Sequence, residues 1–225
     1  MKKVRILSVT FDNEIKPYEI EAFRGSVIHK AGLEHDIFHN HASDGKTINR
    51  YPLIQYKQIK NKPCIFCIEQ GVDEIHHFFT NKDWAVHISG RKLDLKIDRL
   101  DLKSFTMQVW NKTFDYTITD WIALNRENYR KYKELEEEEH KKALLRSVLI
   151  GNIISMAKSI KWDVDKTIEL TISNILRIKP LNFKNNKLIA FDVQFRCNVF
   201  LPVFIGLGKG ASHGMGVIRN NNISF

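Results

Sequence analysis

Short stretches of apolar residues, separated by turn-forming residues, predict a chain that mixes strands and helices. In the first half the pattern predicts this order of elements: a strand at Val4–Val9, a helix over 17–28, strands at Ile48–Ile59 and Cys64–Glu69, a short helix over 71–80, and strands at Trp84–Ile88 and 93–97. The order strand, helix, strand, strand, helix, strand is typical of a ferredoxin-like domain.

The second half partly repeats that order. The pattern predicts a strand over 105–109, a long helix over 127–161, strands at Thr167–Ile178 and Lys187–Val199, and a last strand at Met215–Arg219. In the long helix, Leu145, Leu149 and Ile153 fall on one apolar stripe, which indicates a face that packs on a core. We therefore expect two domains of class α+β, with their boundary near residues 100–104.

Charge is distributed unevenly along the chain, and the C-terminal part carries most of the positive excess. The net charge is +9 with a pI near 9.4, and residues 142–225 alone carry 12 basic and 4 acidic side chains. Concentrated basic charge favours a polyanionic partner such as nucleic acid. No run of apolar residues is long enough to span a membrane, and the basic N-terminus lacks the pattern of a signal peptide, so we expect a cytoplasmic protein.

Cys64 and Cys67 form a C-x-x-C pair, which in other contexts indicates zinc or redox chemistry. Here the pair lies in a predicted strand, where an offset of three places the two side chains on opposite faces. The chain has only one further cysteine, so no second pair completes a site. We interpret both as buried structural thiols.

A glycine-rich segment near the C-terminus is the most informative part of the sequence. Five of the 11 glycines lie within it: Gly206, Gly208, Gly210, Gly214 and Gly216. Such a loop adopts backbone angles closed to other residues, and its amides, with Lys209, His213 and Arg219, suit a phosphate chain. It is neither a dinucleotide fingerprint, because too few residues follow it, nor a P-loop, whose spacing differs.

A second informative stretch runs from Arg24 to Lys57 and holds four of the nine histidines. Histidine transfers protons near neutral pH, so two nearby histidines of this stretch could act as base and acid, and a tyrosine could position or donate a proton. Lysine stabilises charge on a phosphoryl oxygen. Two other interpretations stay open: the histidines are exposed loop residues, or they bind a metal, although their spacing is irregular for a chelating set.

The glycine segment, read as G-Φ-G-x5-G-Φ-G from Gly206 to Gly216, resembles the signature of CRISPR-associated repeat-cleaving endoribonucleases of the repeat-associated mysterious protein superfamily. Phe23-Arg24-Gly25, His39-Asn40-His41 and the string 50–57 resemble the N-terminal half of one archaeal and bacterial branch. Met215 stands where many relatives have Phe, a conservative change for packing.

This resemblance implies a fold of two tandem ferredoxin-like domains, at 1–102 and 103–225, with the glycine-rich loop at the C-terminal end. It implies binding of CRISPR repeat RNA across a basic surface between the domains. It also implies cleavage without metal or other cofactor, leaving a 2′,3′-cyclic phosphate and a 5′-hydroxyl.

The resemblance makes His39 and His41 the candidate catalytic residues, with Tyr51 beside them. The candidate RNA-binding residues are Lys30, Arg50, Lys57, Lys209, His213 and Arg219. The alternative function is a relative that binds repeat RNA without cutting it. Further candidate partners are a CRISPR interference complex and a second copy of the chain.

Overall fold

The computed structural model describes residues 1–39, 50–184 and 186–220. The chain forms two compact units. The first unit comprises Lys3–Phe105 together with Ser212–Gly214, and the second comprises Met1–Lys2, Thr106–Ala211 and the segment from Met215 onward. The sequence-predicted boundary at 102/103 falls inside a strand, β6, which runs from Ile97 to Met107.

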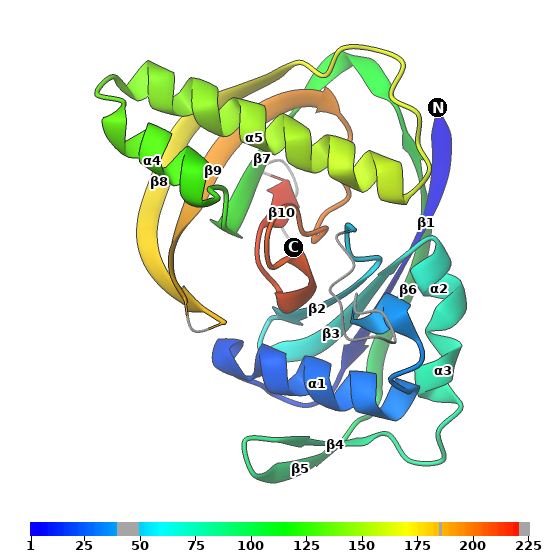
Figure 1. The fold of residues 1–225 in the computed structure, drawn as a ribbon. Coiled ribbons are helices and arrows are strands. Elements are labelled where there is room, and N and C mark those ends of the chain that lie inside the picture. Colours follow the sequence, from blue (N-terminus) through cyan, green and yellow to red (C-terminus); the bar gives the residue numbers. More distant parts are fainter. Residues whose placement is uncertain (40–49, 185, 221–225) are drawn as a thin grey trace. The chain divides into compact units, whose positions relative to one another are not determined.

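A four-stranded sheet forms the centre of the first unit (Figure 1). Its strands are β1 (Lys2–Phe11), β2 (Ile54–Ile59), β3 (Lys62–Ile68) and β6 (Ile97–Met107), in the order β2-β3-β1-β6. The strand β3 is antiparallel to both of its neighbours. Counted along the chain, this is the strand order of a ferredoxin-like fold.

Helices of the first unit complete that fold. A 3-10 turn η1 (Pro17–Glu19) leads into α1 (Ile20–Ala31), and α2 (Gln70–Glu74) and α3 (His76–Phe79) follow β3. Pro17 suits a first helical turn because that position needs no amide donor. The helix α1 packs on the sheet through Phe23, whose ring contacts Phe11 edge to face. Both rings are fully buried.

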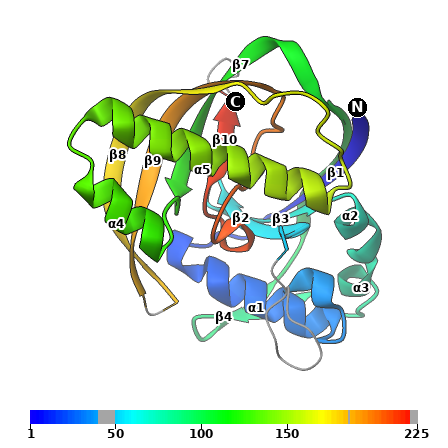
Figure 2. The same ribbon diagram turned by 45° about the horizontal axis from the view of Figure 1, so that its top comes forward.

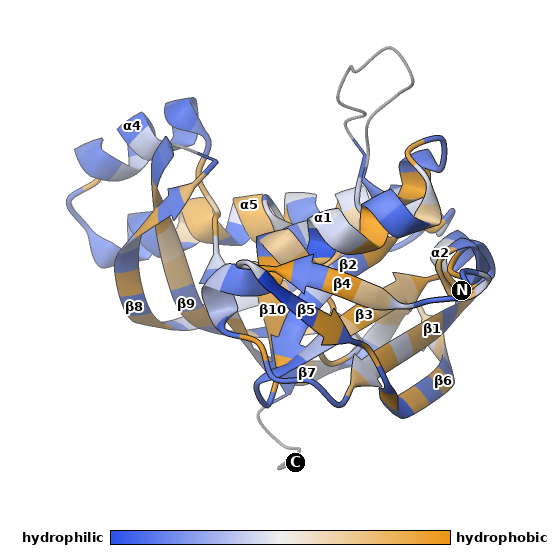
Figure 3. Cartoon of the chain, turned by 90° about the horizontal axis from the view of Figure 1, so that it is seen from below, coloured by the Kyte–Doolittle hydropathy of each residue, from blue (hydrophilic) through white to orange (hydrophobic). Residues whose placement is uncertain are grey.

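The predicted strand at Trp84–Ile88 is not the fourth strand of this sheet, because it pairs with its own neighbour. The strands β4 (Ala85–Ile88) and β5 (Arg91–Asp94) form a separate two-stranded hairpin. Ser89 and Gly90 both have positive φ, 50° and 79°, which favours the tight two-residue turn of a hairpin. The fourth position is taken by β6, along which polar and apolar residues alternate (Figure 3).

The second unit repeats the same strand order. The strands are β7 (Val109–Trp121), β8 (Leu170–Phe183), β9 (Asn186–Val199) and β10 (Val217–Asn220), in the order β10-β7-β9-β8. The helix α5 (Glu138–Ser159) lies across this sheet (Figures 1 and 2). Its stripe of Leu145, Leu149 and Ile153 is fully buried. Between β9 and β10 the fold has residues 200–216, with one 3-10 turn, η3 (Ala211–His213).

The predicted helix over 127–161 is two helices, since α4 (Arg126–Glu134) ends before α5 begins. Leu135 is the first extended residue between them, with φ −75° and ψ 125°. Residues 135–137 are good helix formers, so tertiary packing rather than local propensity ends α4. Tyr132 on α4 is buried and packs edge to face on Phe191 of β9.

All three cysteines are buried free thiols, as predicted for Cys64 and Cys67. Burial raises the pKa of Cys64 to about 11 and that of Cys197 to about 12. No helix within residues 1–39, 50–184 and 186–220 is long and apolar enough to cross a membrane.

Candidate functional site

The segment that carries His39 follows α1 and is anchored by apolar side chains. The 3-10 turn η2 (Asp36–Phe38) buries Ile37 and Phe38, which are 5% and 1% exposed. A short turn with two adjacent buried residues has little freedom to move. His39, directly after the turn, is therefore held at a defined place on the first unit.

Hydrogen bonds fix both the backbone and the ring of His39. The guanidinium of Arg24 donates to the His39 carbonyl at 3.2 Å, and His39 Nε2 lies 3.0 Å from the Leu33 carbonyl oxygen. A carbonyl oxygen only accepts hydrogen bonds, so Nε2 of His39 carries the proton in this contact. Nδ1 is then the basic nitrogen of the neutral ring.

Two further side chains brace the same turn. Arg50 forms an ion pair with Asp36 at 2.9 Å, and the Tyr56 hydroxyl donates to the Phe38 carbonyl at 3.3 Å. Both contacts come from residues on the other side of segment 40–49 in the sequence. The turn is thus tied to the start of β2 as well as to α1.

A buried polar chain connects Tyr51, Gln55 and Lys57. The Gln55 amide nitrogen donates to the Tyr51 hydroxyl at 2.8 Å, and Lys57 Nζ donates to the Gln55 amide oxygen at 2.7 Å. Burial raises the pKa of Tyr51 far above its usual value, so this hydroxyl keeps its proton. Burial lowers the pKa of Lys57 to about 7.

The position of Lys57 differs from what an RNA-binding lysine requires. Its side chain is 1% exposed, and its ammonium faces Gln55 and the ring of Phe66. Burial of this residue on β2 keeps its charge away from solvent. The structure therefore does not place the Lys57 ammonium where it could make the direct phosphate contact expected from the sequence.

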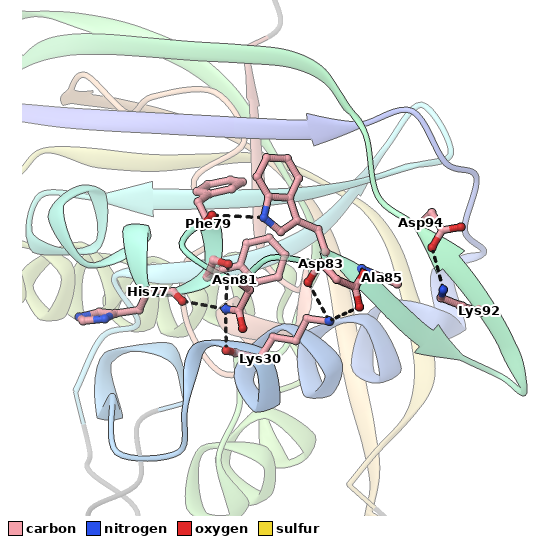
Figure 4. A network of polar contacts seen from close by, with 10 residues as sticks. Lys30, His77, Phe79, Asn81, Asp83, Ala85, Lys92 and Asp94 are labelled. Carbon is pink, nitrogen blue, oxygen red and sulfur yellow. Dashed lines mark hydrogen bonds and ion pairs between the residues drawn. The ribbon is translucent and has the colours of Figure 1, made fainter.

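Lys30 lies near the C-terminal end of α1, where it is tied to the segment before β4 (Figure 4). Its ammonium donates to the Asp83 backbone oxygen at 2.9 Å and pairs with the Asp83 carboxylate at 3.3 Å. The Asn81 amide bonds the Lys30 carbonyl at 2.9 Å. Lys30 is 21% exposed, so part of the side chain is accessible while the pair with Asp83 holds it.

The remaining sequence-predicted residues lie in different parts of the chain. His41 lies outside the described residues. Lys209 and Arg219 are exposed on the second unit, where the Arg219 guanidinium lies over the Phe204 ring. His213 belongs to the first unit, is 8% exposed, and has its Nδ1 3.0 Å from the Ser212 hydroxyl.

The glycines of segment 206–216 serve close backbone packing. Gly216 has φ +61°, and a Cβ built there would lie 1.9 Å from the Leu207 carbonyl oxygen. Gly208 has φ +80°, and its Cβ would meet the Trp121 and Asn152 side chains at 2.9 and 2.7 Å. Both positions therefore require glycine.

Sequence reasoning assigned no role to Arg24 or Gln55, although both lie in the segments that carry the family resemblance. The sequence gives no signal for burial of Gln55, because Ile54–Ile59 contains several polar residues and is equally typical of a strand with one solvated face. No signal marks Arg24 either, since its partner is a backbone carbonyl 15 residues away.

Comparisons with known proteins agree with this architecture. Residues 2–106 match the family profile described as the Cas6b N-terminal domain, and residues 108–221 match the Cas6b C-terminal domain. The chain belongs to the Cas6b family. This confirms the family resemblance drawn from the sequence and the expected fold of two tandem ferredoxin-like domains of class α+β.

Individual proteins similar to this chain agree with the fold. A solved structure described as Cas6b is 26% identical, with a TM-score of 0.82, over 97% of this chain and 100% of that one. A second, described as the CRISPR RNA processing endoribonuclease Cas6b, is 24% identical with a TM-score of 0.73 over the same shares, and shows the fold alone. An uncharacterized protein of Methanocaldococcus jannaschii is 40% identical over 105 residues, which are 45% of this chain and 69% of that protein.

Proposed function

We propose that this Cas6b chain is an endoribonuclease that binds CRISPR repeat RNA and cuts precursor CRISPR RNA without a metal ion. Membership of the Cas6b family supports the substrate, and the geometry at His39 supports the chemistry. The observation that carries the proposal is the fixed ring of His39, with Nε2 against the Leu33 carbonyl and Nδ1 as the basic nitrogen.

The reaction needs one base and one acid. An imidazole of the pair His39 and His41 removes the proton from the 2′-hydroxyl next to the scissile phosphate. The 2′-oxygen then bonds to phosphorus while the bond from phosphorus to the 5′-oxygen breaks. The second imidazole returns a proton to that 5′-oxygen. The products are a 2′,3′-cyclic phosphate and a 5′-hydroxyl.

Neighbouring groups prepare the substrate and the charge. Tyr51 is buried against Gln55, and burial raises its pKa so that it keeps its proton; its role is therefore to position neighbouring groups, and it is not the base. The side chains of Lys30 and Arg50 are 21% and 33% exposed, respectively. They stabilise the charge that develops on the phosphoryl oxygens. Lys209, His213 and Arg219 complete the proposed set of residues that hold the RNA.

The test is cleavage of end-labelled repeat RNA in excess EDTA by wild type, His39→Ala, His41→Ala and the double variant. Wild type should cut at one position, and each substitution should slow the cleavage step by about 10² to 10⁴-fold. His87→Ala is the control, because His87 is exposed on β4. RNA with a single 2′-deoxy substitution before the scissile phosphate should bind and remain intact.

Other outcomes would change the assignment. Tight, salt-sensitive binding of the correct repeat without any product would favour a binding protein. Cleavage that persists in both histidine variants would move the chemistry to other residues. Cleavage by wild type that disappears in EDTA and returns when a divalent ion is added would contradict metal independence.

A further inference from the structure

Three side chains of metal-binding type meet in the first unit, and none of them takes part in the contacts described for His39. They are His35, just before η2, Glu74 at the end of α2, and His77 in α3. One donor atom from each lies within 4.8 Å of the others. The sequence separates the first histidine from the other two residues by nearly 40 positions, so the fold creates this group.

One spacing within the group matches that of a zinc site. His77 Nε2 lies 3.2 Å from the Glu74 carboxylate. In a tetrahedral zinc site with bonds of 2.0 to 2.1 Å, neighbouring ligand atoms are about 3.3 Å apart. The rings of His35 and His77 are stacked, with centroids 3.5 Å apart and planes 21° from parallel. For both lone pairs to point to one ion, the two stacked rings must rotate apart.

The surroundings allow an ion to enter. The side chains of His35, Glu74 and His77 are 25%, 30% and 29% exposed. The backbone beneath them is held, because the Asn81 amide donates to the His77 carbonyl at 3.0 Å. Figure 4 shows the His77 ring pointing away from the network around Lys30 and Asn81. The ring is therefore presented by an anchored backbone.

We propose that His35, Glu74 and His77 bind a Zn²⁺ ion. Two imidazoles and one carboxylate are a common zinc set, and they leave a fourth position for water or another oxygen ligand. The Glu34 carboxylate lies 3.7 Å from His35 Nε2 but outside the compact group of three ligands, and it adds negative charge near the ion. Two nearby carboxylates also offset the charge of the ion.

The ion would act on the segment that leads to His39. His35 lies between Leu33, whose carbonyl contacts the His39 ring, and η2, whose Asp36 pairs with Arg50. A zinc ion shared with Glu74 and His77 fixes His35 to α2 and α3. Because His35 lies between Leu33 and Asp36, the ion also limits the movement of these two residues. The ion has a structural role and takes no part in the cleavage chemistry.

The test is a titration of ZnCl2 into metal-depleted protein in the absence of RNA, by calorimetry and by competition with a chromophoric chelator. Wild type should bind one ion per chain, and its melting temperature should rise with zinc. His35→Gln, Glu74→Gln and His77→Gln should each weaken binding at least about tenfold, as expected for loss of a ligand. Circular dichroism without zinc establishes that each variant is folded.

His140→Gln is the matched control. His140 and Glu137 form the same i,i+3 pair at 3.5 Å, but across the described ranges no third ligand is found close to it. This variant should bind zinc as wild type does. Absence of stoichiometric zinc binding by wild type, or equal affinity in wild type and the His35 and His77 variants, would overturn the proposal. Neither result depends on RNA cleavage.

Discussion

The two units of this Cas6b protein arrange four strands in the same order but differ in the segment that connects the third strand to the fourth. In the first unit, helices α2 and α3 and the hairpin β4–β5 precede β6. In the second unit, residues 200–216 precede β10 with a single 3-10 turn. The histidine segment, in a different connection between α1 and β2 of the first unit, is braced by side chains, whereas the glycine segment, most of which belongs to the second unit, is held by backbone hydrogen bonds.

Backbone hydrogen bonds show why the glycine segment needs no helix. The Leu207 amide donates to the Gly216 carbonyl at 2.8 Å, and the Gly216 amide donates to the Asp120 carbonyl at 3.2 Å. Its polar backbone groups are satisfied by the strands around it, as burial requires. We therefore expect changes in the glycine segment to alter stability and changes near His39 to alter rate.

The largest effect on stability is expected for Gly216→Ala. The new Cβ would lie 1.9 Å from the Leu207 carbonyl oxygen at a backbone φ of +61°, so we expect a loss of about 3 kcal/mol or more. Urea unfolding measures it. Gly151→Ala is the control: this glycine lies in α5 with open space around it, and alanine there should raise stability by about 1 kcal/mol. Equal effects of the two substitutions would contradict the tight packing of the segment.

Lys57→Met should change how the stability of the protein depends on pH. The folded pKa of Lys57 is lowered to about 7 from a usual 10.5, so between these values the unfolded chain holds a proton that the folded chain lacks. Below pH 7 the folded protein must bury a charged lysine, which lowers the free energy of unfolding. As the pH rises from 7 towards 10.5, the free energy of unfolding therefore rises. The advantage of the Met variant over wild type should be greatest near pH 7. It should shrink by up to about 1.4 kcal/mol per pH unit towards pH 10.

Urea unfolding at pH 7, 8 and 9 measures this advantage for the Lys57 variant. Lys103→Met is the control, because Lys103 is exposed on β6 of the same sheet, and its difference from wild type should stay constant. A constant difference for Lys57→Met would mean that the folded protein keeps this lysine charged.

Arg24→Met should lower the rate of cleavage without weakening RNA binding. It removes the donor to the His39 carbonyl, so the ring loses part of its fixed position, and we expect about a tenfold slower single-turnover step. Arg24→Lys keeps a donor and should restore most of the rate. Arg99→Met is the control, since Arg99 is exposed and pairs with Asp101 on its own strand. A change in affinity with an unchanged rate would assign Arg24 to RNA binding.

The smallest effect is expected for Lys209→Gln on the second unit. Lys209 is exposed, and removal of one phosphate contact should lower the slope of log affinity against log salt by about 0.7 for single-stranded RNA. Binding measured at several salt concentrations gives this slope. Lys133→Gln, on the solvated face of α4, should leave it unchanged. The same slope in wild type and Lys209→Gln would remove Lys209 from the RNA-binding set.

The sequence predicted the strand order better than it predicted the extent of individual elements. Short, mostly apolar runs bounded by turn residues located β3 and β9 closely, because both strands are buried over most of their length. The break between α4 and α5 was missed, since residues around Leu135 favour a helix and only packing ends it. The local pairing of β4 with β5 was missed because the pattern of a strand does not name its partner.

The site was predicted by residue type, whereas its contacts required the fold. Histidine chemistry singled out His39 and His41, but nothing in the spacing could show that Lys57 is enclosed or that Arg24 reaches the His39 carbonyl. Both depend on contacts between residues far apart in the chain. The roles of the predicted site residues, a homodimer and an interference complex stay predictions.

Ser212–Gly214 belongs to the first unit, although the rest of that unit ends at Phe105. Gly214 lies so close to the Tyr56 carbonyl oxygen and the Ile20 side chain that a Cβ there would be 3.2 Å from each. During translation, which proceeds from the N-terminus, this part is made only after Thr106–Ala211 of the second unit. A nascent chain can build most of the histidine-bearing unit early, but completes it only after most of the second unit has been made.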